Sequence, residues 1–249
     1  MNVWVYAIGS IVFISLLSLG GVFTLALNPG RLKQILLYLV SFAVGGLYGD
    51  AFIHLIPEAF RKFGIGMTPC LYILGGIFLF FLVEKTIRWS QDSISESINH
   101  VHPLVPMMLT IDATHNFIDG LVIGASYSVS IPIGIATSLA VIFHEIPHEI
   151  GDFAVLVHGG FTVKKALIFN FLTALTSILG AIISLSIGSA LTGYSEIILP
   201  ITAGGFIYIA GSDLIPELQK DNKFSKSFWQ LACIVAGTGI MVLLLMFEK

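Results

Sequence analysis

The stretch HEIPHE at residues 144–149 lies inside the long apolar run 132–158, and HNFIDG at 115–120 lies inside the run 105–128. Ionisable side chains inside a lipid bilayer are costly and rare, so they are candidates for function. Imidazole, carboxylate and amide groups are ligands of a borderline divalent metal such as zinc. The two stretches therefore predict a membrane protein that takes a metal ion into the bilayer.

The composition predicts a polytopic membrane protein. Of the 249 residues, 56% are hydrophobic and only 11% are charged, whereas a soluble domain has about 25% charged residues. The net charge of −3 gives no indication of nucleic-acid binding. Two cysteines are too few for a disulfide framework or a thiolate metal site. We expect one all-α transmembrane domain covering 1–249.

Apolar runs long enough to cross a bilayer, which takes about 20 residues, occur eight times. No basic residue precedes the first run, so we expect a retained helix there and not a cleaved signal peptide. The predicted spans are 3–27, 34–60, 69–89, 105–128, 132–158, 163–191, 196–218 and 226–247.

Basic residues predict the orientation. With the N-terminus outside, nine of the twelve Lys and Arg residues fall in inner loops or at inner span ends. The excess of Lys and Arg on the cytoplasmic side of membrane proteins then predicts that both termini lie outside. We expect a multi-pass protein of the cell membrane.

An internal repeat runs through the chain. Gly-Gly at 45–46 followed by HLIPE at 54–58 matches Gly-Gly at 204–205 followed by DLIPE at 213–217, at an offset of 159 residues (204 minus 45). The copies lie in the second and seventh spans, which run in opposite directions. An inverted repeat of this kind is common in secondary transporters. The predicted arrangement is 3+2+3: spans in 1–90 and 163–249 form the repeats, and the central pair in 103–158 carries the site.

The central pair carries two polar stripes, because residues three and four apart share one helix face. Five carboxylates there would cost on the order of 12–17 kcal/mol if they were deep and unpaired. Neither span contains Lys or Arg, so a bound dication or protons must offset this cost. The candidate metal-binding residues are His115, Asn116, Asp119, His144, Glu145, His148 and Glu149.

A second group of polar residues predicts a pathway to and from the site. We expect metal to enter from outside near His54 and Glu58 and to leave past Asp213 and Glu217. Asp112 and Asp152, on the polar stripes, belong to the same predicted pathway. For the pair His54 and Glu58 in the second span, and for Asp213 and Glu217 in the seventh, the competing interpretation is that these side chains cap helix ends.

At these residues the chain resembles the ZIP family of divalent-metal transporters, in the branch with a His-Glu-x-Pro-His-Glu signature. The matching pieces are 115–120, HEIPHEIGD at 144–152 and GDAFIHLIPEA at 49–59. The resemblance implies a carrier that moves zinc toward the cytoplasm, with a two-metal site between the fourth and fifth spans. One ion would be held by His115, Asp119, His144 and His148, and a neighbouring site would be shaped by Asn116, Glu145 and His148, with Glu149 nearby.

The predicted function is secondary transport of Zn²⁺, with Fe²⁺, Mn²⁺ and Cd²⁺ as open alternatives. No ATP-binding Gly-Lys-Ser/Thr loop is present. We expect no enzyme activity. The assemblies considered for this chain include a homodimer. The alternative function is an intramembrane zinc metalloprotease, because residues 144–148 also read H-E-x-x-H. Pro147 within that motif and the internal repeat both argue against a protease.

Overall fold

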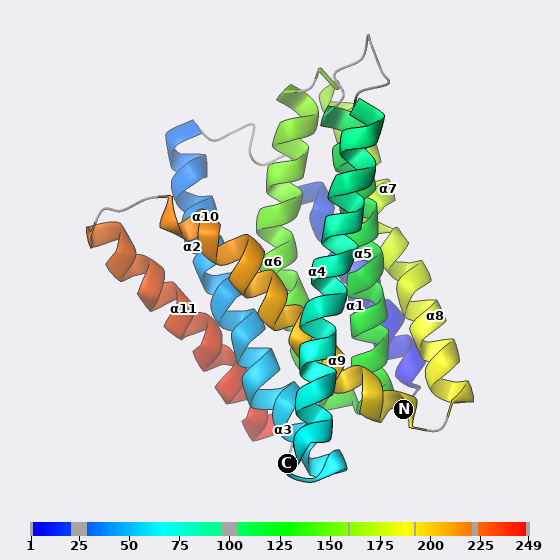
Figure 1. Cartoon of the computed structure of the whole chain (residues 1–249). Helices are drawn as coiled ribbons and strands as arrows, with labels where there is room; N and C mark the ends of the chain where they lie inside the picture. Colours follow the sequence, from blue (N-terminus) through cyan, green and yellow to red (C-terminus); the bar gives the residue numbers. More distant parts are fainter. Residues whose placement is uncertain are drawn as a thin grey trace.

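The computed structural model describes residues 2–20, 29–95, 104–158, 160–191, 193–220 and 224–247. Every regular element in these ranges is helical, which confirms the all-α prediction (Figure 1). The elements are α1 (Val3–Leu17), α2 (Pro29–Gly49), the π-helical η2 (Asp50–Leu55), α3 (Ile56–Phe63), α4 (Met67–Ser95), α5 (Leu104–Val129), α6 (Ile131–His158), α7 (Val163–Ala174), α8 (Thr176–Ala190), α9 (Tyr194–Tyr208), the π-helical η3 (Ile209–Leu214), α10 (Ile215–Gln219), α11 (Phe224–Leu244) and the 3₁₀ turn η4 (Leu245–Phe247).

Seven described helical segments are long and apolar enough to cross a membrane. The remaining long helix, α5, has 26 residues and carries the polar stripe with Asp112 and Asp119, which lowers its hydropathy. The predicted count of eight spans stays a prediction. The predicted second span corresponds to α2, η2 and α3 together, and the predicted seventh span to α9, η3 and α10.

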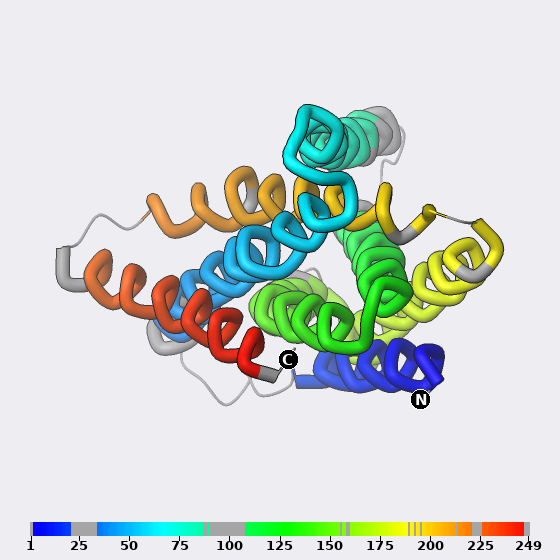
Figure 2. The backbone as a smooth tube through the Cα atoms, turned by 90° about the horizontal axis from the view of Figure 1, so that it is seen from below, coloured from blue at the N-terminus to red at the C-terminus, as the bar shows by residue number. Residues whose placement is uncertain are grey.

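The central pair lies inside the bundle. Viewed from below, α5 and α6 are surrounded by the other helices, while α4 lies at the edge (Figure 2). The close approach of α5 to α8 depends on Gly120, where a Cβ atom would lie 1.9 Å from the carbonyl oxygen of Ser177. The neighbour that Gly120 allows to approach α5 is therefore α8.

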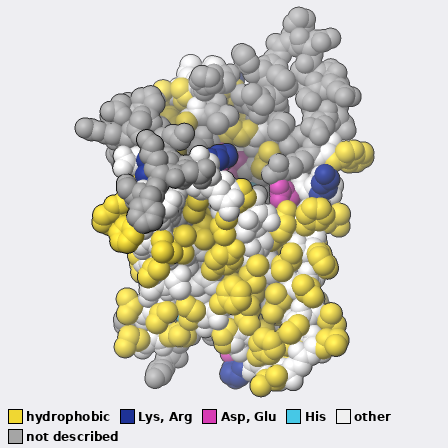
Figure 3. Space-filling view, turned by 60° about the vertical axis from the view of Figure 1, so that its left-hand side comes forward, with side chains coloured by type: hydrophobic (Ala, Val, Ile, Leu, Met, Phe, Trp, Pro, Cys, Tyr) yellow, Lys and Arg dark blue, Asp and Glu magenta, His cyan; other side chains and the backbone are white. Residues whose placement is uncertain are grey.

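The outside of the bundle is apolar, as a lipid-facing surface requires. Large side chains such as Leu71, Phe78 and Leu82 of α4 are exposed. Figure 3 shows apolar side chains over the middle of one face, with described charged side chains near its two ends. Figure 1 places the two marked ends of the chain at the same end of the bundle. The prediction that both termini lie outside stays a prediction.

The two predicted repeats have matching contacts. In Figure 1, α2 runs downward and α9 runs upward, so the copies have opposite directions. A Cβ atom at Gly45 of α2 would lie 2.0 Å from the Ile234 carbonyl oxygen of α11, and one at Gly204 of α9 would lie 2.1 Å from the Ile73 carbonyl oxygen of α4. Each copy therefore packs backbone against backbone with the span that follows the other copy, as an inverted repeat would.

The π-helical segments occupy equivalent positions in the two copies. Asp50 opens η2 and Ile209 opens η3, again 159 residues apart (209 minus 50), and each segment has six residues. η2 packs against α9, and η3 packs against α2. The two copies therefore cross at their π-helical segments, next to the central pair.

Candidate metal centre

His144 of α6 is the most enclosed residue of the predicted site, with no exposed surface. Its Nδ1 lies 3.2 Å from the carbonyl oxygen of Ala140. A carbonyl oxygen only accepts, so Nδ1 carries the hydrogen of this bond. Nε2 points the other way and lies 3.0 Å from Oδ2 of Asp119 on α5. A fixed Nδ1–H bond of this kind orients the other nitrogen of a metal-binding histidine toward the ion.

Four side chains from α5 and α6 bring their ligand atoms within 4.8 Å of one another: His115, Asp119, His144 and Glu145. Oε1 of Glu145 lies 3.3 Å from Nε2 of His115 and 3.6 Å from Nε2 of His144. Nε2 of His115 lies 3.9 Å from Oδ2 of Asp119. Ligands about 2.0–2.1 Å from a tetrahedral zinc ion lie about 3.3 Å apart. The four separations of 3.0–3.9 Å between these atoms are close to the spacing that one such ion requires.

The unsatisfied polar atoms also fit a cation. Among the described residues, buried side-chain atoms without a hydrogen-bond partner include Nε2 of His115 and His148, Oδ1 of Asp119 and Oε1 of Glu145. Burying a polar atom without a partner is unfavourable. Two of these atoms, Nε2 of His115 and Oε1 of Glu145, lie in the cluster of four, where a bound cation would satisfy them.

His148 lies beside the four-residue cluster and is not part of it. Its ring stacks on that of His115, with ring centroids 5.0 Å apart and planes at 29°. The ring of His144 is farther away, with centroids 6.1 Å apart. His148 is one turn after His144 on α6, which continues as a helix through Pro147. The predicted ligand His148 therefore lies within reach of the cluster.

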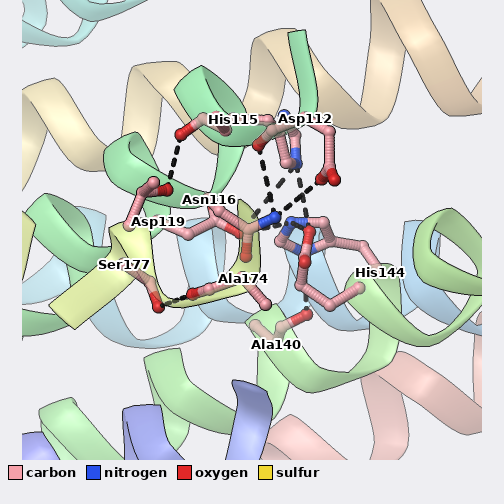
Figure 4. A network of polar contacts seen from close by, with 11 residues as sticks. Asp112, His115, Asn116, Asp119, Ala140, His144, Ala174 and Ser177 are labelled. Carbon is pink, nitrogen blue, oxygen red and sulfur yellow. Dashed lines mark hydrogen bonds and ion pairs between the residues drawn. The ribbon is translucent and has the colours of Figure 1, made fainter. Parts of the chain in front are cut away.

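Two other predicted ligands make hydrogen bonds elsewhere. The Asn116 amide donates to Oδ1 of Asp112 at 2.8 Å and to its carbonyl oxygen at 3.3 Å. Figure 4 shows these two residues in one network with His115, Asp119 and His144. Glu149 accepts a 2.5 Å hydrogen bond from Asn170 of α7. Neither Asn116 nor Glu149 belongs to the cluster of four.

A cavity of about 520 Å³ connects the cluster to one end of the bundle. His115 and His148 line its deep part, and the predicted pathway residues Asp112 and Asp152 form its walls. Glu217 also lines it, beside Lys220, and the two side chains are 55% and 69% exposed. The cavity therefore reaches the surface at α10. The side chain of the fourth residue expected here, Asp213, lies outside those that the structure describes.

The predicted entry residues lie apart from this cavity. His54 is only 3% exposed, and its Nε2 donates to the carbonyl oxygen of Met241 at 2.9 Å. Glu58 is paired with Arg61 at 2.6 and 2.5 Å. Neither residue lines the cavity, and their role in entry stays a prediction.

Three further buried polar residues were not predicted as site residues: Asn170, Asp50 and Thr137. Asn170 is a polar amide inside the apolar run 163–191, and a polar residue in such a run could have been selected from the sequence as a candidate. Asp50 is fully buried on η2 and accepts a 2.9 Å hydrogen bond from Thr137 of α6. That contact joins distant parts of the chain, and no spacing in the sequence indicates it.

Comparison with known proteins gives consistent matches. A family model described as ZIP Zinc transporter matches residues 1–107 and 89–245. Zinc transporter zipt-7.2 of Caenorhabditis elegans is 33% identical over 308 residues, covering 99% of this chain and 66% of the relative. Zinc transporter ZIP13 of Pongo abelii is 37% identical over 234 residues, covering 87% of this chain and 68% of the relative.

A human relative is similar over the whole chain. Zinc transporter SLC39A7 of Homo sapiens is 30% identical over 338 residues, covering 100% of this chain and 72% of the relative. The chain thus spans roughly two thirds to three quarters of the length of these three relatives.

Proposed function

The chain belongs to the ZIP zinc transporter family, and on that premise we propose that it is a secondary transporter that carries Zn²⁺ into the cytoplasm. The observation that carries this proposal is the buried cluster of His115, Asp119, His144 and Glu145, whose ligand atoms lie within 4.8 Å of one another. These four residues hold the transported ion between α5 and α6, and His148 becomes a further ligand by a change of side-chain rotamer.

The cytoplasmic end is the end at which the cavity opens. Lys220 stands at the cavity mouth, directly after α10. The end of α4 and the start of α7 lie toward the same end of the bundle (Figure 1). Lys85 is in the second half of α4, and Lys164 and Lys165 are in the first turn of α7. Basic residues concentrate on the cytoplasmic side of membrane proteins. This orientation supports release of the ion past Asp112, Asp152 and Glu217.

Entry takes place at the other end, near His54 and Glu58. Both ends cannot be open at once in a carrier, and in this structure Asp50 and His54 are held by hydrogen bonds at the closed end. A second conformation must release these contacts to admit an ion. The membrane potential can drive inward movement, because a dication gains about 4.6 kcal/mol from 100 mV.

The ligand set favours zinc among divalent metals. Two imidazoles and two carboxylates in a tetrahedral arrangement suit Zn²⁺, and Fe²⁺, Mn²⁺ and Cd²⁺ remain candidates because geometry and availability decide selectivity. The predicted homodimer and the assignment to the cell membrane stay predictions. Members of this family are transporters, so the metalloprotease alternative has no support.

Zinc uptake by vesicles carrying the full-length protein tests the proposal. The double variant His144→Ala, His148→Ala removes one cluster ligand and its neighbour, and we expect uptake to fall by at least about 100-fold. Ser138→Ala is the matched control: Ser138 is buried on the same helix and donates only to the Gly134 carbonyl oxygen. Parental uptake in the double variant would refute a transport site between α5 and α6. Competition by unlabelled Fe²⁺, Mn²⁺ and Cd²⁺ in the same assay ranks the alternative cargoes.

A further inference from the structure

Asn170 is a fully buried amide in the middle of the apolar helix α7. Its Nδ2 donates to Oε2 of Glu149 at 2.5 Å and lies 3.3 Å from each of two carbonyl oxygens, those of Glu149 and Ser18. Three oxygens from α6 and from the end of α1 thus surround one NH₂ group. The arrangement fixes the direction of the amide and, with it, the position of the Glu149 carboxylate.

Glu149 lies beside the ligand cluster, and its Oε2 accepts a hydrogen bond from Asn170. It follows Glu145 by one helical turn, so the two side chains lie on the same face of α6. It also interacts with Asn116 of α5 and, electrostatically, with Glu145, Asp112 and Asp152. Asp112 and Asp152 line the cavity, as does the neighbouring His148, but Glu149 does not. Its carboxylate is 3% exposed and points toward α7.

On the basis of the proposed function, we propose that Asn170 is a positioning residue that holds Glu149 out of the exit route, so that the ion is not trapped there. A free Glu149 could turn from α7 toward Glu145 and add a carboxylate to the cluster. Added carboxylates tighten cation binding. A transport site must bind strongly enough to load and weakly enough to unload.

The competing explanation is that Asn170 only fastens α7 to α1 and α6, as polar side chains between membrane helices often do. The two explanations differ in whether the effect of replacing Asn170 depends on the acid at position 149. A fastening role would weaken the fold whichever side chain stands at 149. A positioning role requires the acid at 149, because without that acid there is nothing to hold away from the route.

The test is a double-mutant cycle of the full chain: parent, Asn170→Ala, Glu149→Gln and both together. Zinc affinity is measured by equilibrium dialysis of purified protein, and zinc uptake is measured in proteoliposomes. We expect Asn170→Ala to bind zinc about tenfold more tightly and to transport it with a maximal rate about tenfold lower. In the Glu149→Gln background, we expect the same substitution to change zinc affinity by less than about twofold.

A swapped pair covers the case in which Asn170→Ala does not fold. Asn170→Asp keeps the shape but has no donor, and combining it with Glu149→Gln restores an amide–carboxylate hydrogen bond in the reverse direction. We expect this pair to return zinc affinity toward the parental value. Ser15→Ala is the matched control, because Ser15 of α1 donates to the Ala174 carbonyl oxygen of α7 without touching an acid.

Three outcomes would overturn the proposal: unchanged or weaker zinc binding in Asn170→Ala, an equal effect of that change in the Glu149→Gln background, or loss of zinc binding in Glu149→Gln alone, which would make Glu149 a ligand. Failure of the proposed function is a separate result. A parent that binds zinc but does not move it across the membrane would end the transport proposal, while the dialysis cycle would still decide the role of Asn170.

Discussion

The π-helical segments η2 and η3 have the same length and equivalent positions, but their surroundings differ. Ile209 and Ser212 of η3 line the cavity that reaches the surface. In η2, which we take as the closed end, the side chains are buried and engaged: Asp50 accepts a hydrogen bond from Thr137, and His54 donates to the Met241 carbonyl oxygen. Two copies of one backbone can thus place side chains beside an open cavity in one case and in buried hydrogen bonds in the other.

The difference between the copies rests on few interactions. A hydrogen bond contributes about 0.5–1.5 kcal/mol net, so two of them favour the closed end by a small margin. Conformations separated by a few kcal/mol exchange readily, with the minor one populated at about 0.1–10%. The structure thus describes one of two expected states. In the other state, η2 would face an open route and η3 would be closed.

The largest expected effect is a difference in accessibility between the two segments. We expect a cysteine at Ser212 to react with a water-soluble thiol reagent about 10- to 1,000-fold faster than a cysteine at His54, because the closed end opens only in a minor state. The ratio is measured by comparing the labelling rates of the two cysteine variants, each in a protein in which Cys70 and Cys233 are replaced by serine. Equal rates would remove the distinction between an open and a closed copy.

The next effect concerns the glycine contacts that the two copies share. Gly45→Ala and Gly204→Ala each place a Cβ atom about 2 Å from a carbonyl oxygen, and we expect each to cost about 1–3 kcal/mol or more. Thermal unfolding in detergent measures the loss. Gly75→Ala is the control, since its Cβ atom would meet nothing within 4 Å. Tolerance of the change in one copy alone would show that the repeats are packed differently.

A smaller effect is expected at the closed end. Thr137→Val keeps the shape of the side chain but removes one hydrogen bond to Asp50, at a cost of about 1 kcal/mol. The open form of that end should then become about fivefold more populated. Thr137→Val should raise the labelling rate of the His54→Cys protein by the same factor, measured against His54→Cys alone, because both proteins lack the His54 hydrogen bond. An unchanged rate would mean that the Asp50–Thr137 contact does not hold this end shut.

The smallest effect is expected for the ion pairs that follow the repeats. Lys220 pairs with Glu217 after η3, and Arg61 pairs with Glu58 after η2. Both basic side chains are about 70% exposed, and exposed ion pairs contribute little to stability. We expect Lys220→Ala and Arg61→Ala to leave the unfolding temperature unchanged within error. A clear loss for only one would reveal a further difference between the copies.

The sequence was sufficient to predict the helical class and to place the cluster residues on two neighbouring helices. Asp119 and His144 lie in different helices, but each follows the helical periodicity of an otherwise apolar span, so their faces could be deduced. Four of the seven predicted ligands form the cluster. Glu149 follows the same periodicity, but its carboxylate accepts a hydrogen bond from Asn170 of α7, which lies 21 residues away. Periodicity gives the side of a helix and not the partner found there.

Other features depend on contacts that no local pattern encodes. The π-helical turns at Asp50 and Ile209 interrupt runs whose apolar periodicity looks continuous. His54 was predicted on the pathway from its place in the repeat, but its ring is engaged by a backbone carbonyl of α11. A carbonyl oxygen is present at every residue, so a hydrogen bond to one cannot be predicted from the sequence.

The glycine contacts explain why the duplication is faint in the sequence. At Gly45 and Gly204 the helices touch through main-chain atoms, which every amino acid shares. The flanking side chains can therefore diverge while the architecture is inherited unchanged. During evolution, the two repeats would remain similar at a few small residues and prolines after the rest of their sequences had diverged.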